Sequence, residues 1–424
     1  MITIVKADGT AEQQQIAAMR ERAAKTGAGI EQSAREIMEA VRQRGYEAVK
    51  EYSLKFDGAE PYEIPKSELQ AAAERIAPKL LGALRRSAEN IRAYQTELLC
   101  KSRQWESPMK GGTVGQVVRG LSRVGIYVPG GRAAYPSSVL MNAVPAKVAG
   151  CGEVIMVTPP TENLNDAVLA AAWVAQVDRV IAVGGVQAVA ALTFGSGFIP
   201  RVDKLVGPGN AFVAAAKRMA YGTLDIDMVA GPSEVLVIAD ETANPVYTAA
   251  DLLSQAEHDV MASAVLLTTS QTLADQVAQE MERQTGYLSR SDVIMQSLRD
   301  YGAIIVCDSL EKCCDLANEI APEHLEIMTE DPRALLPKIL NAGAVFLGQN
   351  TPEPLGDYMA GPCHVLPTSG TARFFSPLSV ESFLKKMSII DFSRDALAEV
   401  KDEIIAMAES EHLTAHANSI KVRF

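Results

Sequence analysis

The chain has 424 residues, of which 48% are hydrophobic and 22% are charged, and its formal net charge is −12. This composition is typical of a globular protein with two or three domains and excludes a disordered or fibrous chain. The acidic balance disfavours a nucleic-acid partner, because binding to phosphates requires a basic surface.

No targeting or membrane segment is indicated. The first residues, MITIVKADGTAEQQQ, lack the basic start and apolar run of a signal peptide, and no stretch approaches the roughly 18–20 apolar residues of a membrane span. We therefore expect a cytoplasmic protein with no membrane partner. The six cysteines are scattered without a C-x-x-C pair, so we expect no disulfides, and any metal should have nitrogen and oxygen ligands.

Helices are predicted first along the chain, followed by alternating strands and helices. From Ala11 to about Leu99, apolar residues recur at spacings of three and four, which predicts helices. After the glycine-rich residues 111–115, short β-branched runs end in Gly or Pro and alternate with helical segments. The runs are VGIYVP, EVIMVTPP, RVIAVGG, KLVGPG, EVLVIAD, ASAVLLTTS, GAIIVCDS and AGAVFLG. They predict parallel strands buried on both faces, in two successive α/β sheets.

The last segment, from about Ser379, is predicted to be a helix-rich tail with little apolar content of its own. Such a tail must pack on its own domain or on that of a partner.

Three glycine-containing turns follow strands in the first half. In VGPGNAFV, Gly207, Gly209 and Asn210 lie between a strand and a helix, where backbone N–H groups and the helix dipole favour a phosphate. AVGGVQAV, which contains Gln187, and VGIYVPGGRAAYPSSV form the other two turns. Each alone is more often simple turn geometry. Three on neighbouring strand ends predict a nucleotide-binding crevice.

Candidate ligands and acid/base groups lie in the second half. Gln255 and His258 stand three apart in a helical stretch, so both can face one point, although a single histidine is usually structural. Glu323 and His324 are adjacent at the approach to an apolar strand. They can serve one site only if the backbone is irregular there, and the alternative is a strand edge with one side chain in solvent.

Two further histidine segments follow. Asp357 and His364 lie in a Gly- and Pro-rich loop long enough to be functional. His412 and His416 have the i, i+4 spacing of a helical metal pair. This pair lacks the glutamate of H-E-x-x-H, so its spacing can also be a coincidence.

Segments spread over most of the chain resemble the histidinol dehydrogenase family, in the same order. They are YPSSVLMNAVPAKVAG, VGPGNAFV, AGPSEVLVIAD, LLSQAEHD, APEHLEI and GDYMAGPCHVLPTSGTARF. The resemblance implies a homodimer that uses one Zn²⁺ per subunit and NAD. It also implies the four-electron oxidation of L-histidinol to L-histidine through L-histidinal, the last step of histidine biosynthesis.

The resemblance implies roles for individual residues. The implied zinc ligands are Gln255, His258, Asp357 and His416. Glu323 and His324 would be the acid/base residues, and the positions expected to contact NAD are Tyr127, Gln187 and Asn210. Ser233 and Glu411 would hold the substrate together with His324 and the zinc ligands. The chain departs from the family pattern at Cys363, where Asn is usual, and at His412, where a small residue, often Gly, is usual.

With this family we expect two incomplete, doubly wound, Rossmann-like α/β domains. The expected parts are an N-terminal arm (1–23), a domain with the zinc and acid/base residues (24–126 with 235–378), an NAD-binding domain (127–234) and a tail (379–424). The tail would be exchanged between subunits, so that Glu411 and His416 act in the active site of the other copy.

The residue types fit this chemistry. Two imidazoles, a carboxylate and an amide oxygen suit zinc and leave room for a substrate. His324 would take the proton of the alcohol, and Glu323 would activate the water that adds to the aldehyde. Two other functions remain open: a zinc hydrolase that needs no nucleotide, and a non-catalytic metabolite-binding protein.

Overall fold

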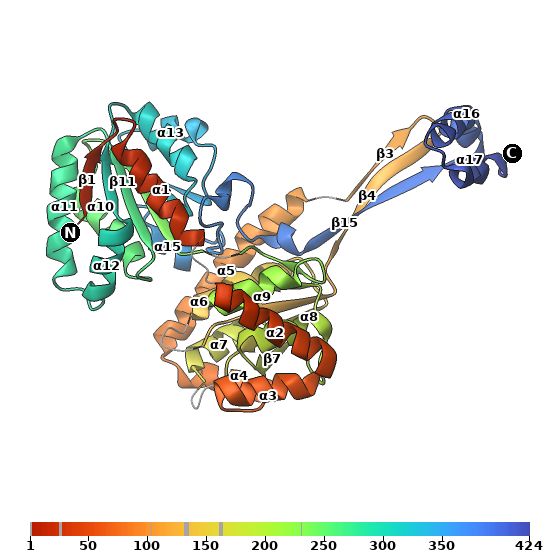
Figure 1. Cartoon of the computed structure of the whole chain (residues 1–424), viewed down its shortest axis with the longest axis horizontal. Coiled ribbons are helices and arrows are strands. Elements are labelled where there is room, and N and C mark those ends of the chain that lie inside the picture. The colour runs from red at the N-terminus through yellow and green to blue at the C-terminus, as the bar shows by residue number, and fades with distance from the viewer. Residues whose placement is uncertain (1, 25–27, 103, 131–134, 161–163, 230) are drawn as a thin grey trace.

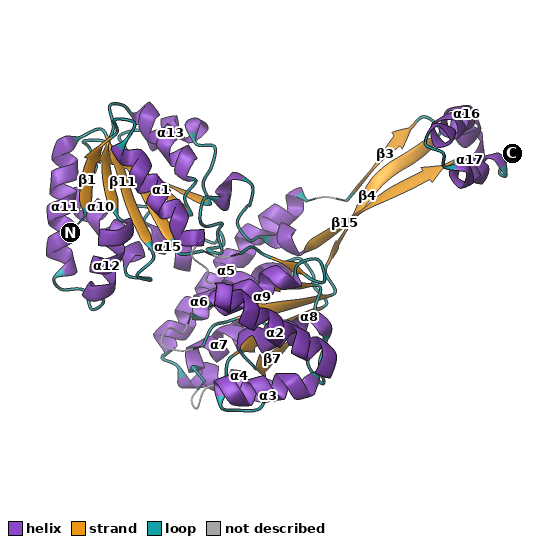
Figure 2. Cartoon of the chain, in the orientation of Figure 1, coloured by secondary structure: helices purple, strands orange, loops and turns teal. Residues whose placement is uncertain are grey.

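The computed structural model describes residues 2–24, 28–102, 104–130, 135–160, 164–229 and 231–424. It consists of two α/β domains and a projecting arm (Figures 1 and 2). We name the domains after their six-stranded sheets, the sheet-A domain and the sheet-B domain. The predicted α/β fold with two successive sheets is confirmed. In the described part of the chain, no helix has the length and apolar content needed to cross a membrane.

Sheet A is parallel throughout, in the order β1-β12-β11-β10-β13-β14. Its strands are β1 (Thr3–Lys6), β10 (Glu234–Ala239), β11 (Ser263–Thr268), β12 (Ala303–Val306), β13 (His324–Met328) and β14 (Ala344–Leu347). The helices of this domain are α1 (Ala11–Ala24), α10 (Pro245–Ala256), α11 (Gln271–Thr285), α12 (Ser291–Tyr301), α13 (Leu310–Ile320), α14 (Pro332–Leu335) and α15 (Glu353–Tyr358).

Side chains of sheet A alternate between two cores. Val235 and Val237 pack with α10, α11 and α12, whereas Leu236 and Ile238 pack with α1 and α13. Both faces of the sheet are therefore buried, as the continuous apolar runs predicted.

Sheet B has the order β2-β7-β6-β5-β8-β9 and is parallel except for the pairing of β2 with β7. Its strands are β2 (Tyr62–Ile64), β5 (Arg123–Tyr127), β6 (Glu153–Thr158), β7 (Arg179–Ala182), β8 (Lys204–Val206) and β9 (Asp225–Ile226). Its helices are α2 (Ala28–Arg44), α3 (Tyr46–Asp57), α4 (Lys66–Arg75), α5 (Pro78–Lys101), α6 (Pro136–Val148), α7 (Asp166–Val174), α8 (Gly185–Phe194) and α9 (Ala211–Ala220). One core lies under α4–α7 and the other under α2, α3, α8 and α9.

The predicted domain boundaries are wrong at the N-terminal end. β2 and all of β5 except Tyr127 fall within 24–126 but pair with β7 and β6 of sheet B, and α2–α5 cover that sheet (Figure 1). β1, placed in the expected arm 1–23, is an edge strand of sheet A. Short, partly exposed strands such as β1 and β2 have no buried apolar run. Their composition therefore does not reveal their partners.

The arm is a three-stranded antiparallel sheet that projects from the sheet-B domain and ends in two helices (Figure 1). It contains β3 (Trp105–Met109), β4 (Gly112–Gly120), β15 (Leu384–Phe392), α16 (Arg394–Ser410) and α17 (Thr414–Lys421). Nine residues of β15 pair with β4. The tail is thus not purely helical, because residues 384–392 form a strand. The described residues also include the short 3₁₀ helices η1 (Leu336–Lys338), η2 (Thr371–Arg373) and η3 (Val380–Phe383).

Candidate active site

A cavity of about 390 Å³ is lined by residues of both α/β domains. Its lining residues from the segments around sheet A include Ser233, Gln255, His258, Glu323, His324, Asp357 and His364. Those from the segments around sheet B include Tyr135, Ser137, Ser138, Gly207, Pro208 and Asp227. Six of the predicted site residues, from four separate segments of the chain, therefore meet in one cavity.

Glu323 and His324 both line the cavity although they are adjacent. His324 is the first residue of β13, and Glu323 lies in a bend just before the strand. Ala321, with φ of +53°, ends α13 in the left-handed conformation. This irregular backbone is what a shared site requires, and the alternative of a strand edge with one exposed side chain is excluded.

Hydrogen bonds fix the orientation of this pair. Nδ1 of His324 lies 3.0 Å from the carbonyl oxygen of Glu234, which can only accept, so Nδ1 carries a proton. Oε2 of Glu323 accepts the N–H of Glu234 at 2.9 Å. Nε2 of His324 is buried without a hydrogen-bond partner among the described residues and lies 3.8 Å from Oδ1 of Asp357. In the neutral ring, Nε2 is therefore the basic nitrogen.

Gln255 and His258 lie at the end of α10 and in the following turn. Gln255 is fully buried, and its Nε2 lies 3.3 Å from Nδ1 of His258. Its Oε1 has no hydrogen-bond partner among the described residues. An unpaired buried amide oxygen is costly unless a ligand satisfies it.

Burial and neighbouring charges set the protonation states. Burial lowers the pKa of His258 and of His364, so both rings are neutral near pH 7. Burial alone would raise the pKa of Asp357, but His324 and His364 outweigh it and hold that pKa below its usual value. The cavity thus combines neutral imidazoles with an ionised carboxylate, the forms in which these side chains bind metals.

The acid/base pair is strongly perturbed. Burial raises the pKa of Glu323 to about 8. Burial alone would lower the pKa of His324, but Glu323 and Asp357 outweigh it and raise that pKa to about 10. Perturbed groups of this kind are typical of functional sites.

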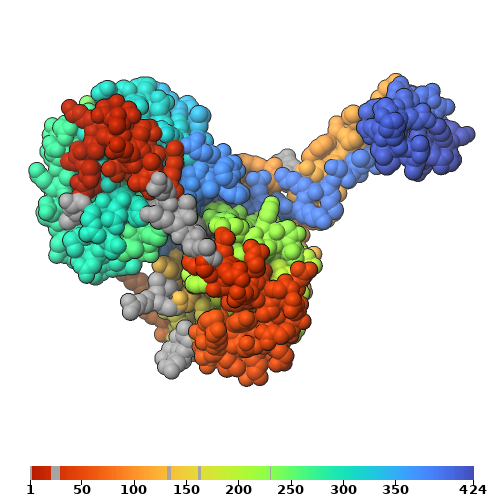
Figure 3. Space-filling model, in the orientation of Figure 1, coloured from red at the N-terminus to blue at the C-terminus, as the bar shows by residue number. Residues whose placement is uncertain are grey.

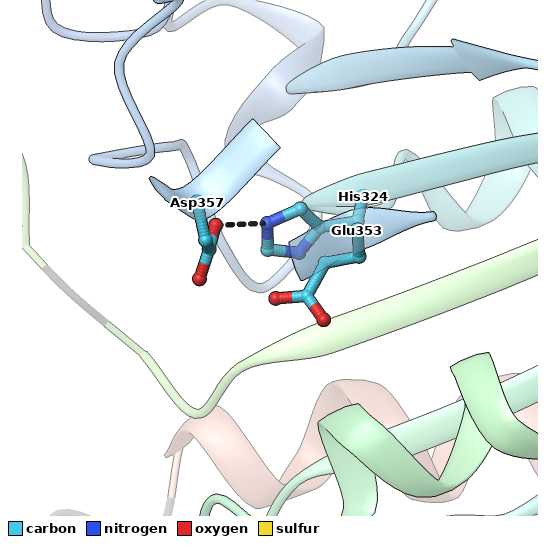
Figure 4. A group of neighbouring side chains, drawn as sticks. All are labelled: His324, Glu353 and Asp357. Carbon is cyan, nitrogen blue, oxygen red and sulfur yellow. Dashed lines mark ion pairs between the residues drawn. The ribbon is translucent and has the colours of Figure 1, made fainter. Parts of the chain in front are cut away.

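Asp357 belongs to two groupings of possible metal ligands, the predicted one with Gln255 and His258 and a second one with His324 and Glu353 (Figure 4). One ligand atom from each of His324, Glu353 and Asp357 lies within 4.8 Å of the others. Burial raises the pKa of Glu353 to about 7, so this carboxyl is partly protonated near neutrality and is a weaker ligand than Asp357. The unpaired oxygen of Gln255 and the neutral ring of His258 favour the predicted grouping.

The three positions expected to contact NAD lie at or after the carboxyl ends of β5, β7 and β8 of sheet B, of which β5 and β8 are neighbours. Tyr127 ends β5, and its hydroxyl accepts the N–H of Gly185 at 3.0 Å. Gln187 lies in the first turn of α8 and donates to Oδ2 of Asp57 at 3.0 Å. Asn210 caps α9 by accepting two N–H groups. β5 and β8 flank the point where strand order reverses, which is where open α/β sheets bind ligands.

None of these three side chains is among those lining the cavity. The third predicted turn is only partly visible, because residues 131–134 lie outside the described residues. The nucleotide site therefore stays a prediction that strand order supports.

Glu411 and His416 lie at the far end of the arm and are exposed (Figure 1). They do not line the cavity of their own chain. His412 lies in the turn between α16 and α17, so His412 and His416 do not form the i, i+4 pair of one helix.

The structure shows the local surroundings of the two residues that depart from the family pattern. His412 has φ of +60°, a left-handed conformation that favours glycine, so a small residue would fit this turn at lower cost. The Cys363 thiol is buried and donates to the carbonyl oxygen of Met141 at 3.3 Å. This contact joins the loop to α6.

Two side chains near the cavity were not assigned roles from sequence. His364 lies 3.8 Å from Oδ1 of Asp357 through its Nδ1. Glu353 stands four residues before Asp357 on α15. That i, i+4 spacing was a readable signal, whereas the approach of His364 depends on the path of the loop.

Comparisons with known proteins agree with the motifs. The histidinol dehydrogenase family model matches residues 20–424. Histidinol dehydrogenase of Clostridium acetobutylicum is 52% identical over 410 residues, which cover 96% of this chain and 95% of the relative. That of Caldanaerobacter subterraneus subsp. tengcongensis is 53% identical over 394 residues, with 92% and 91% covered. The crystal structure of histidinol dehydrogenase from Elizabethkingia anophelis aligns with a TM-score of 0.93 and 36% identity, covering 100% of this chain and 98% of that one.

Proposed function

This chain belongs to the histidinol dehydrogenase family, and on that premise we propose that it oxidises L-histidinol to L-histidine with two NAD molecules and one zinc ion per site. The observation that carries this proposal is the cavity in which Gln255, His258, Glu323, His324 and Asp357 meet. The reaction consumes one alcohol, one water and two NAD⁺, and it yields one carboxylate, two NADH and three protons.

The residues present fit a zinc ion. Gln255 supplies an unpaired buried oxygen, His258 a neutral imidazole and Asp357 an ionised carboxylate. We propose these three as ligands, with His416 of a second copy as the fourth. When bound, zinc would supply a positive charge that holds an amino alcohol by its nitrogen atoms. Ser233, in the cavity wall, and Glu411 of the second copy would contact the same substrate.

His324 is the proposed base for the alcohol. Its Nδ1 proton is directed to the carbonyl of Glu234, so Nε2 is left to take the hydroxyl proton. The pKa of His324 depends on the negative charge of Asp357 and Glu323. Neutralising Asp357 with a cation would therefore lower the pKa of His324 and favour its basic form.

Glu323 is the proposed base for the second step. The aldehyde must add water before a second hydride can leave, and Glu323 lines the same cavity as His324. Its carboxyl is held by the N–H of Glu234. Ionised Glu323 would take a proton from the attacking water. Tyr127, Gln187 and Asn210 would contact NAD, which accepts the hydride at each step.

The test is a stoichiometric assay. We expect two NADH per L-histidinol, measured by absorbance, and loss of the signal when a chelator removes zinc. Hydrolysis of an ester or amide without NADH would favour a zinc hydrolase. Binding of histidinol without turnover would favour a metabolite-binding protein.

We further propose a homodimer that exchanges its arms. The arm stands clear of both α/β domains (Figure 3). It also exposes large apolar side chains, namely Trp105, Met109, Met387, Ile390, Phe392, Val400, Met407, Leu413, Val422 and Phe424. Exposed apolar surface on a projecting segment favours docking on another chain. Docking on a second copy would bring Glu411 and His416 to the cavity of that copy.

Subunit complementation tests the exchange. His416→Ala and His324→Asn chains, each inactive alone, are mixed under conditions that allow subunit exchange. If His416 acts across the interface, a heterodimer has one intact site and one site with both defects. Each heterodimer should then have about half the activity of a wild-type dimer. Continued inactivity with exchange confirmed by mass would contradict shared sites without affecting the proposed reaction.

A further inference from the structure

Three elements of the sheet-A domain carry the proposed ligands and the acid/base pair. α10 contains Gln255 and leads to His258, β13 begins with His324, and α15 contains Asp357. The proposed site depends on how these three elements are placed relative to one another.

Buried and half-buried polar side chains connect the three elements. Oγ of Ser254 on α10 donates to Oε2 of Glu353 on α15 at 3.0 Å. The N–H of Glu353, the first residue of α15, donates to Oε1 of Glu326 on β13 at 2.8 Å. The carboxyl group of Glu326 also lies close enough to that of Asp251 on α10 for each to influence the pKa of the other. We call these four residues the buried link.

The burial of these acidic groups needs a reason. Asp251, Glu326 and Glu353 are 8%, 1% and 2% exposed. Burial raises the pKa of Asp251 to about 6 and that of Glu326 well above its ordinary value, so the fold favours the protonated form of both carboxyl groups. Apolar side chains at such positions are often as stable or more stable. The buried link is therefore better explained by what it positions than by stability.

We propose that Asp251, Ser254, Glu326 and Glu353 are positioning residues that hold the zinc ligands of α10 and α15 in register with His324 on β13. The inference rests on the proposed function, because zinc and histidinol are its ligands. Each link residue lies within four positions of a residue that lines the cavity, so a shift in the link is passed directly to that residue. Small displacements of this kind lower affinity and rate strongly.

The test compares two substitutions of one side chain with a matched control. Glu326→Leu removes the acceptor for Glu353 and the partner of Asp251. Glu326→Gln keeps both contacts, because its amide oxygen accepts and its NH₂ group donates. The control is Glu12→Leu, since Glu12 is a fully buried glutamate of the same domain that accepts the N–H of Gly9 at 2.8 Å.

Zinc dissociation constants are measured by competition with a chelating dye, and thermal unfolding is followed on the metal-free proteins. We expect Glu326→Leu to bind zinc about 10–100-fold more weakly than wild type, with Glu326→Gln and Glu12→Leu close to wild type. Equal zinc affinity of Glu326→Leu and Glu12→Leu overturns the positioning role. A wild-type protein that binds no zinc instead refutes the proposed function, and this inference with it.

If Glu326→Leu does not fold, Ser254→Ala replaces it. Its matched control is Ser297→Ala, because Ser297 is a buried serine of the same domain that donates to the carbonyl of Ala262 at 2.9 Å. We expect weaker zinc binding only in Ser254→Ala. Equal zinc affinity of the two variants overturns the inference.

Discussion

The two α/β domains line the cavity with different kinds of groups. The sheet-A domain contributes titratable side chains, among them His258, Glu323 and His324. The sheet-B domain contributes backbone turns such as Gly207–Pro208, together with Asp227. In the proposed reaction, the sheet-A domain therefore supplies the metal ligands and the acid/base groups. The sheet-B domain supplies the turns against which the cofactor would bind.

The turn at Gly207 shows how sheet B holds that shape. Asp227 accepts the N–H of Gly207 at 2.8 Å, and Lys217 donates to the carbonyl oxygen of Gly207 at 2.8 Å. Lys217 and Asp227 also form a buried ion pair with each other. Both polar groups of Gly207 are thus satisfied by one ion pair, which fixes the turn at the cavity wall.

The largest effect is expected from removing a proposed zinc ligand of sheet A. His258→Ala and Asp357→Ala should lose bound zinc and reduce kcat/KM by at least about 1,000-fold, or about 4 kcal/mol. His412→Gly is the control, since His412 is exposed in a left-handed turn and should keep zinc. Metal analysis and NADH formation measure both outcomes. Full zinc occupancy in either alanine variant would contradict the assignment.

The acid/base pair should divide its effects between the two half-reactions. His324→Asn should slow oxidation of histidinol by about 100-fold or more, because it removes the base for the hydroxyl proton. Glu323→Gln should mainly slow oxidation of supplied histidinal, because only that step consumes water. Single-turnover rates on each substrate measure the division. Equal losses on both substrates in both variants would mean that the two residues act as one unit.

The sequence predicts sheet A and its site better than the arm, for physical reasons. β10, β11 and β13 are buried on both faces, so their composition alone identifies them. β3 is exposed at every position and β15 nearly so, which removes the apolar pattern. The role of Glu326 was not predicted, because the sequence of its apolar strand does not reveal that Asp251 and Glu353 lie beside it in the fold.

A smaller effect should follow a change in the backbone turn of sheet B. Gly207 has φ of +105°, and a Cβ there would lie 2.2 Å from the carbonyl oxygen of Tyr127, so Gly207→Ala must displace the turn. We expect it to raise KM for NAD about 10-fold and to destabilise the fold by about 2–4 kcal/mol. Gly222→Ala is the matched control. Gly222 has φ of +95° with nothing within 4 Å, so only the conformational cost remains. Equal KM values for NAD in the two variants would show that the turn at Gly207 does not contribute to the cofactor site.

The smallest effect concerns the pH dependence of stability in the buried link. Burial raises the pKa of Asp251 to about 6, from 3.8 for an ordinary aspartate, although the neighbouring carboxyl group of Glu326 opposes the shift. A pKa raised by folding means that the protonated group favours the folded state. The contribution of protonated Asp251 to the stability of the fold is complete below the pKa of this group in the unfolded chain. It is lost as the pH rises through about 6, the pKa in the folded protein.

Asp251→Asn cannot ionise, so this loss should disappear in the variant. Between about pH 5 and pH 8, the free energy of unfolding of the metal-free wild type should fall by about 1–2 kcal/mol more than that of Asp251→Asn. Urea unfolding at each pH measures both values. Burial also raises the pKa of Glu323 and of Glu353, to about 8 and about 7, and both remain in the two proteins. The difference between the two curves therefore reports Asp251 together with Glu326, because the charge of Asp251 helps to raise the pKa of Glu326. Asp275→Asn, on the exposed surface of α11, should follow the wild-type curve. If Asp251→Asn also follows it, Asp251 is ionised in the folded protein and the proton of the buried link resides elsewhere.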